Sequence, residues 1–188
     1  MTRLTDKPSH PASRATFAAG CFWCTEAVYT RLRGVSSVIP GYANGSSEFA
    51  TYADVQAGSG HAEAVQITYD PAVISYDQLL TVFFGTHDPT TPDRQGHDIG
   101  PQYRSAIFTH DEEQREVAER VKKQLTHDQI FSAPIITLIE PLRNFTPAER
   151  SHKNYYALNR QEPYCQLVID PKIAKLRSTY AALLKPDM

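Results

Sequence analysis

A turn from a strand into a helix is the sequence feature that most constrains the fold of this chain. Residues 14–19 predict a short strand, and residues 25–32 have the spacing of an amphipathic helix. Gly20 lies at the junction, so Cys21 falls at the helix N-terminus. The free amide groups and the positive dipole end at that position favour a thiolate. The turn therefore predicts a nucleophilic cysteine.

Two aromatic rings and a second thiol follow Cys21 directly. Phe22 and Trp23 are placed to shape a small apolar pocket, and Cys24 completes a C-x-x-C unit. By itself such a unit indicates a dithiol redox site or half of a zinc site. The zinc interpretation is weak because the sequence contains no second C-x-x-C or H-x-x-H motif. The alternative for Cys21 is a buried structural cysteine.

Size and composition indicate one catalytic domain. A chain of 188 residues suffices for a single core, and we expect a flexible tail over residues 1–13 and one domain over 14–188. The formal net charge of −2 and the lack of a long apolar run argue against binding to nucleic acid or a membrane. Only three cysteines are present, which favours a reducing, cytoplasmic setting over a disulfide framework.

The order of predicted elements defines the fold class. From residue 16 to 109 the order is strand, helix, strand, strand, helix, strand, with strands at 35–42, 63–69 and 103–109 and Ser75 capping the second helix. This is the split βαβ plan of an α+β, ferredoxin-like sandwich. The C-terminal extension is predicted to form helices at 111–126, 146–158 and 172–184 and strands at 134–140 and 164–169.

Several polar side chains are candidates for chemistry. Glu63 opens a half-buried strand, where burial would raise its pKa and make it a proton donor, although a solvated acid at a strand end fits the pattern equally. Tyr52 and Tyr103 offer phenol donors. Asp98 lies in the long polar loop 87–102, where it either orients a neighbour or caps the turn. Cys165 is either a core residue or a mobile thiol that closes a disulfide with Cys21.

Taken together, these segments closely resemble peptide methionine sulfoxide reductase A, from about residue 15 to 185. The matching motifs, in order, are Gly20-Cys21-Phe22-Trp23, Thr51-Tyr52, Gly60-His61-Ala62-Glu63, Tyr69-Asp70-Pro71, His87-Asp88-Pro89, Gln95-Gly96-His97-Asp98 and Gln102-Tyr103-Arg104-Ser105. The chain departs from the family pattern in having Cys24 where Gly is common, His97 where Asn is common, and Phe49-Ala50 in place of Asn-Pro.

The resemblance implies a role for each matching residue. Cys21 corresponds to the nucleophile, and Cys165 to a recycling cysteine that many members carry, while Cys24 adds a second candidate for that role. The substrate contacts implied are the S-methyl cradle of Phe22 and Trp23, the acid Glu63, the oxygen-binding phenols Tyr52 and Tyr103, and the polar pocket residue Asp98.

The implied activity is reduction of methionine S-sulfoxide, free or in peptides. Attack by Cys21 would leave a sulfenic acid, a second thiol would form a disulfide, and a thioredoxin-type dithiol would reduce it, with no metal or organic cofactor and with the protein as a monomer. A general C-x-x-C thiol–disulfide oxidoreductase is the alternative enzyme, but it leaves Glu63, Tyr52 and Tyr103 unexplained. A non-enzymatic scaffold or metal-binding domain is the third interpretation.

Overall fold

The computed structural model describes residues 12–186, so the predicted tail lies outside the described residues as far as residue 11, and Ser13 already begins the first strand. The helices and strands, in chain order, are β1 (Ser13–Ala19), α1 (Phe22–Tyr29), β2 (Val35–Ala43), α2 (Tyr52–Gln56), β3 (Ala62–Tyr69), α3 (Tyr76–Thr86), β4 (Arg94–Gln95), β5 (Asp98–Ile99), the 3₁₀ turn η1 (Pro101–Tyr103), β6 (Ser105–Thr109), α4 (Glu112–His127), β7 (Leu138–Pro141), β8 (Phe145–Pro147), the 3₁₀ turn η2 (Arg150–His152), α5 (Tyr155–Leu158), the π-helix η3 (Cys165–Ile169), α6 (Asp170–Thr179) and the 3₁₀ turn η4 (Ala181–Leu183).

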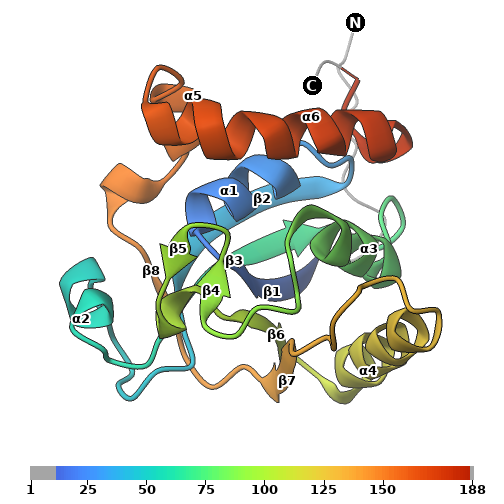
Figure 1. The fold of residues 1–188 in the computed structure, drawn as a ribbon, viewed down its shortest axis with the longest axis horizontal. Helices are drawn as coiled ribbons and strands as arrows, with labels where there is room; N and C mark the ends of the chain where they lie inside the picture. Colours follow the sequence, from blue (N-terminus) through green and yellow to red (C-terminus); the bar gives the residue numbers. More distant parts are fainter. Residues whose placement is uncertain (1–11, 187–188) are drawn as a thin grey trace, which may run out of the picture.

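A mixed six-stranded sheet forms the centre of the molecule, in the order β7-β6-β1-β3-β2-β8. Its pairs are antiparallel except for β6 with β7. Helices α1 and α3 pack against the sheet, and α6 lies beside α1 (Figure 1). The predicted α+β class, with helices packed on a central sheet, is confirmed.

The two faces of β1 bury different kinds of side chain. Phe17 points to the helical side, where its ring centroid lies 5.6 Å from that of Tyr29 in α1 and 5.3 Å from that of Phe83 in α3. Ala18 points to the other side, into a small cluster with Ala64 and other alanines. This alternation is what a strand between two covered faces requires, and the large core lies under the helices.

Side-chain caps fix the starts of two helices. The Ser75 hydroxyl accepts a hydrogen bond from the Gln78 amide at 3.2 Å, and the Ser75 amide donates to the Gln78 side-chain oxygen at 2.9 Å, so the predicted cap of α3 is confirmed as a capping box. Asp111 caps α4 by accepting from the Gln114 amide at 2.8 Å. In the part of the chain that the structure describes, no helix is both long and apolar enough to cross a bilayer.

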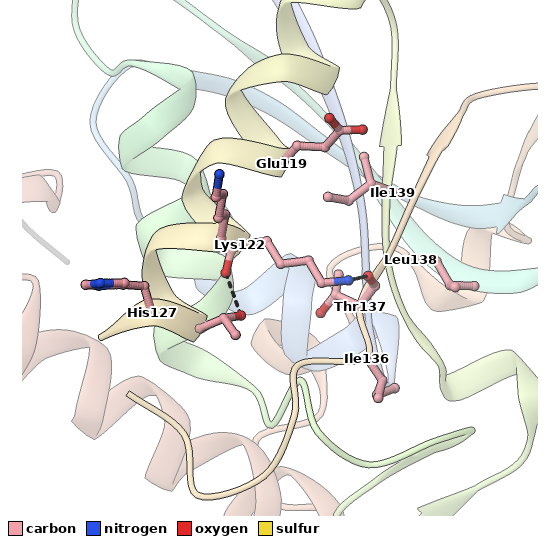
Figure 2. A pocket seen from close by; sticks show the side chains of 9 residues that line it. Glu119, Lys122, His127, Ile136, Thr137, Leu138 and Ile139 are labelled. Carbon is pink, nitrogen blue, oxygen red and sulfur yellow. Dashed lines mark hydrogen bonds between the residues drawn. The ribbon is translucent and has the colours of Figure 1, made fainter. Parts of the chain in front are cut away.

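The segment before β7 departs from the sequence prediction. A strand was expected over residues 134–140, but pairing with β6 begins only at Leu138. Ile136 donates its amide to the Pro89 carbonyl at 2.9 Å instead of to the sheet. Figure 2 shows Lys122 of α4 reaching this segment, where its Nζ donates to the Thr137 carbonyl at 2.7 Å. These tertiary contacts override the local strand preference.

The predicted helix over residues 146–158 is wrong in its first half. Residues up to Pro147 form β8, which pairs with β2, and only α5 is α-helical. Asn154 has a left-handed backbone (φ 57°), which interrupts any helix approaching from the N-terminal side. Glu26 of α1 holds the Asn154 amide in that conformation.

The predicted strand over residues 164–169 is also wrong. Residues 163–179 are continuously helical, and Cys165–Ile169 within them form a π-helical turn that runs into α6. Local sequence misled here because an aromatic and β-branched run resembles a strand. Pro163 occupies the first turn of the helix, a position where its missing amide costs nothing. This helix carries Tyr164 and Cys165 toward α1.

Candidate active site

The predicted strand-to-helix turn is confirmed at Gly20. Cys21 is the N-cap of α1, and Gly20 before it has φ 86°, a conformation that L side chains rarely adopt. A Cβ on Gly20 would lie 2.5 Å from the Cβ of Gln95 in β4, so the position also has no room for a side chain. The turn therefore needs glycine both for its positive φ and for lack of space, and the β4–β5 hairpin packs directly on it.

Two thiols lie together at the start of α1. Cys21 and Cys24 are both buried, and both line a cavity of about 200 Å³ with Asp98, Tyr164 and Lys172 among its other walls. Burial raises the pKa of Cys21, and its hydrogen bond with the Cys24 thiol raises the pKa further. The same hydrogen bond, with help from the positive charge of Lys172, lowers the pKa of Cys24.

This corrects the expectation that Cys21 rests as a thiolate. A helix N-terminus stabilises a negative charge by only about 0.3–1 kcal/mol at an exposed site. Desolvation of a fully buried thiolate costs more, and here it dominates. In the resting protein Cys21 is therefore a thiol.

Glu63 is buried beside the thiols, as one of the two sequence alternatives predicted. It belongs to β3, only 2% of it is exposed, and its Oε2 accepts a hydrogen bond from the Phe22 amide at 3.1 Å. Burial, with smaller contributions from the charges of Asp98 and Cys24, raises the pKa of Glu63 to about 8 against the opposing effect of the Phe22 bond. At neutral pH this carboxyl group is therefore mostly protonated and able to donate.

An aromatic wall stands next to this carboxyl group. Phe22 is buried, and Trp23 stacks on Tyr155 with ring centroids 3.7 Å apart and planes 6° from parallel. The Trp23 indole donates to Nδ1 of His152 at 3.2 Å, and the His152 ring lies 5.2 Å from Phe22 and 5.1 Å from Tyr52, centroid to centroid. Sequence reasoning missed His152 and Tyr155, because both are more than a hundred residues away from Trp23.

The two predicted phenols frame the same site from separate elements. Tyr52 begins α2 and is 40% exposed, whereas Tyr103 ends η1, before the strand in which it was expected. Burial raises the pKa of both, and the negative charges of Glu63 and Cys21 raise both further, which places all four groups close together. Sequence reasoning also missed Glu149. Its carboxylate accepts a hydrogen bond from the Tyr52 amide at 2.7 Å and another from the Tyr42 hydroxyl at 2.7 Å.

Asp98 and the start of η3 close the site on the Cys24 side. The Tyr164 hydroxyl donates to Oδ2 of Asp98 at 2.6 Å and lies 3.7 Å from the Cys24 sulfur. Cys165 is fully buried in the main core and does not line the cavity that Cys21 and Cys24 share. The structure thus brings every predicted site residue except Cys165 together around the Gly20 turn.

Other parts of the described chain do not resemble this site. A cavity of about 620 Å³ lies between α4 and β7, and the residues that line it include no cysteine (Figure 2). Within residues 12–186, no group of three or more His, Cys, Asp or Glu side chains is placed to hold a metal ion.

Paired buried thiols beside a neutral carboxyl group define a thiol-dependent redox enzyme. Comparison with known proteins identifies which one. The sequence profile of the family described as Peptide methionine sulfoxide reductase matches residues 13–183. The chain therefore belongs to the peptide methionine sulfoxide reductase family, as the resemblance of its motifs predicted.

Individual relatives agree with this assignment. The peptide methionine sulfoxide reductase MsrA of Chromobacterium violaceum is 54% identical over 173 residues, which cover 92% of this chain and 98% of that protein. Mxr1 from Saccharomyces cerevisiae in reduced form is 36% identical with a TM-score of 0.74, over 82% of this chain and 89% of that one. Mxr1 in complex with Trx2 is 27% identical with a TM-score of 0.53, over 80% and 91% of the two chains.

Proposed function

We propose that this protein reduces methionine S-sulfoxide, free or within peptides, to methionine, and so repairs oxidised proteins. The observation that carries the proposal is the protonated carboxyl group of Glu63 held beside the Cys21 thiol. A sulfoxide sulfur is a poor electrophile until its oxygen is protonated or strongly hydrogen-bonded. A neutral acid next to a thiol supplies both halves of that reaction.

Substrate binding uses the aromatic wall and the two phenols. The S-methyl group packs against Phe22 and Trp23, whose rings are fixed by stacking and by the Trp23–His152 hydrogen bond. Tyr52 and Tyr103 donate to the sulfoxide oxygen, since the charge of Glu63 acts on the pKa of both phenols, after burial, and so places them near that acid. Donors on one side and an apolar slot on the other select one epimer.

The chemical step starts with proton donation by Glu63 to the bound oxygen. The Cys21 sulfur attacks the activated sulfoxide sulfur, methionine is released, the oxygen remains on Cys21 as a sulfenic acid, and the thiol proton of Cys21 restores the Glu63 carboxyl group. Between these two proton transfers Glu63 is a carboxylate in a buried site, a state that the Phe22 amide stabilises. Stabilisation of charge where it develops is the main contribution of such a site.

Recycling requires a second thiol to condense with the sulfenic acid. The resemblance pointed to Cys165, with Cys24 as the alternative. Geometry supports Cys24 as the first attacker, because it lies in the first turn of the helix that Cys21 caps and lines the same cavity as Cys21. Burial raises the pKa of Cys165, and the charge of Cys24 raises it further, so Cys165 lies near enough to Cys24 to take part in a later thiol–disulfide exchange.

The reductant of the resulting disulfide is a thioredoxin-type dithiol. The relative Mxr1 forms a complex with Trx2, which supports the same kind of partner for this chain. A monomeric state and a cytoplasmic location stay predictions.

The finer fold class is also part of this proposal. The strand order β6-β1-β3-β2, with α1 between β1 and β2 and α3 between β3 and β6, supports a ferredoxin-like split βαβ core. Strands β7 and β8 then extend that core at its two edges, as parts of the C-terminal extension.

Turnover of the two separate methionine sulfoxide epimers, with a dithiol donor, tests the proposed activity. We expect turnover of the S epimer, both free and in a peptide, and none by the Cys21→Ser variant, because a hydroxyl has far too high a pKa to replace the thiol. Insulin disulfide reduction, measured in parallel, tests the general thiol–disulfide oxidoreductase. Disulfide reduction without sulfoxide turnover, or equal turnover of both epimers, would contradict the proposal.

A further inference from the structure

Cys24 and two polar side chains from other elements form a line. The Cys24 sulfur of α1 lies 3.7 Å from the hydroxyl of Tyr164, and that hydroxyl lies 2.6 Å from Oδ2 of Asp98 in β5. Tyr164 stands at the entry to the π-helical turn η3. Turns of this kind occur often at functional sites.

The direction of the hydrogen bonds in this line follows from counting protons. A tyrosine hydroxyl has one hydrogen, and the 2.6 Å distance to a carboxylate oxygen shows where it points. The oxygen of Tyr164 is then free to accept, and the S–H group of Cys24 is its neighbour. The chain of donors therefore runs from thiol to phenol to carboxylate.

We propose that Tyr164 is a catalytic residue of the recycling step, passing the proton of Cys24 to Asp98 as Cys24 attacks the sulfenic acid on Cys21. This inference rests on the proposed function. The Cys24 proton moves to the Tyr164 oxygen while the Tyr164 proton moves to Asp98, so the phenol is regenerated. The new S–S bond forms, the S–O bond of Cys21 breaks, and the departing hydroxide takes the proton from Asp98 and leaves as water. Cys21 and Cys24 are joined as a disulfide, with no external oxidant.

Burial explains why Cys24 needs such a relay. The residue is only 2% exposed, so bulk water has poor access to its proton. In the resting protein the largest cause that lowers the pKa of Cys24 is the hydrogen bond from the Cys21 thiol. That S–H group no longer exists once Cys21 is a sulfenic acid. Tyr164, whose oxygen lies 3.7 Å from the Cys24 sulfur, then remains as its hydrogen-bond partner.

The other titratable and charged groups that face Cys24 do not offer the same path. Glu63 and Cys21 belong to the sulfoxide side, and Lys172 of α6 carries a positive charge that favours the thiolate but accepts no proton. Cys165 has a pKa raised by its own burial. The Tyr164–Asp98 pair is the acceptor chain that touches the Cys24 sulfur.

Single-turnover kinetics of Tyr164→Phe test the relay. One equivalent of methionine sulfoxide is mixed with reduced protein, and methionine release and the loss of free thiols are followed as separate time courses. We expect disulfide formation to slow by ~10-fold or more relative to methionine release, because loss of general-base assistance typically costs ~10²–10⁴ in rate. Tyr180→Phe, which removes a phenol that donates to the Thr81 carbonyl, is the matched control.

The pH profile separates a proton relay from a loss of packing. In Tyr164→Phe the rate of disulfide formation should rise about tenfold per pH unit below the pKa of Cys24, because only the thiolate fraction reacts. The unsubstituted protein and Tyr180→Phe should show a much flatter profile. Asp98→Asn should reproduce the steep profile, and it keeps the test open if Tyr164→Phe fails to fold.

Several outcomes would overturn the inference. One is a Tyr164→Phe variant that forms disulfide as fast as the unsubstituted protein, or that slows both steps equally. Another is mapping by mass spectrometry that finds Cys21 joined directly to Cys165 in the first turnover. Failure of the proposed function looks different, because the unsubstituted protein would then release no methionine at all.

Discussion

Glu26 of α1 holds the backbone amide of Asn154 with both carboxylate oxygens, each 2.9 Å away. Glu26 is 4% exposed, and burial raises the pKa of its carboxyl group, while the bonds from the Asn154 and Tyr155 amides oppose the rise. This pair connects the catalytic helix to the loop whose side chains His152 and Tyr155 fix Trp23. Glu26 therefore positions the aromatic wall without touching the substrate.

Glu26→Gln should weaken substrate binding more than the chemical step. An amide has one oxygen to accept with and carries no charge, so we expect a loss of roughly 1–2 kcal/mol in unfolding free energy. We also expect a higher KM with a smaller change in kcat, because Trp23 loses its fixed partners. Steady-state kinetics and urea unfolding measure both effects, with the exposed Glu116→Gln as control. A KM that does not move would show that the wall is held by other contacts.

Gly20→Ala should cost more stability than Gly58→Ala. Both glycines have positive φ, 86° and 91°, so both substitutions bring the backbone strain of about 1–2 kcal/mol. A Cβ at Gly58 meets nothing within 4 Å, whereas at Gly20 it meets Gln95 at 2.5 Å. We expect Gly20→Ala to lose a further ~1 kcal/mol or more and to displace Asp98 with the hairpin. If urea unfolding shows equal losses of unfolding free energy for the two variants, the β4–β5 hairpin moves aside at no cost.

Glu63→Gln should slow methionine release by ~10²–10⁴ in single-turnover experiments, because the amide hydrogen-bonds but gives up no proton. With the pKa of Glu63 near 8, the rate of the unsubstituted protein should fall as the pH rises through about 8. The glutamine variant should lack that decline. An unchanged rate for Glu63→Gln would remove Glu63 from the mechanism.

The same carboxyl group should make the protein less stable as the pH rises. Its pKa is about 8 in the folded state and ~4.3 when unfolded, so the folded state binds the proton more tightly. The contribution of Glu63 to the unfolding free energy is therefore highest below about pH 4, falls between about pH 4 and 8, and levels off above. At pH 8 Glu63→Gln should be more stable than the unsubstituted protein by roughly 2–4 kcal/mol. Urea unfolding at pH 5 and 8 checks this; a constant difference between the two proteins would contradict it.

The two candidate recycling thiols should behave differently when removed. Cys165→Ser should still form a disulfide between Cys21 and Cys24 at the normal rate, because Cys165 does not line their shared cavity. Cys24→Ser should accumulate a sulfenic acid that a dimedone-type reagent traps. Peptide mapping after one equivalent of substrate distinguishes the two. Rapid disulfide formation in Cys24→Ser would return the first role to Cys165.

Local features of the sequence were enough to predict the catalytic turn. Gly20 marks a backbone with positive φ, Cys21 follows as an N-cap, and Ser75 starts α3 through a capping box. Each of these motifs spans no more than four consecutive residues. The alternating pattern around Glu63 predicted a half-buried strand, which left the choice between a buried and a solvated acid open. These predictions succeeded because local backbone geometry depends on neighbouring residues.

Only the tertiary structure decided how the site is completed. The run at residues 164–169 has strand-forming residues, yet packing against α1 makes it helical and brings Tyr164 to Cys24, 140 residues earlier in the chain. His152 reaches Trp23 across 129 residues, and Asp98 reaches Tyr164 across 66. Contacts of this range leave no trace in local spacing. The sequence by itself therefore determined the nucleophile and its turn, whereas burial in the folded core decided that Glu63 is protonated and that Tyr164 lies beside Cys24.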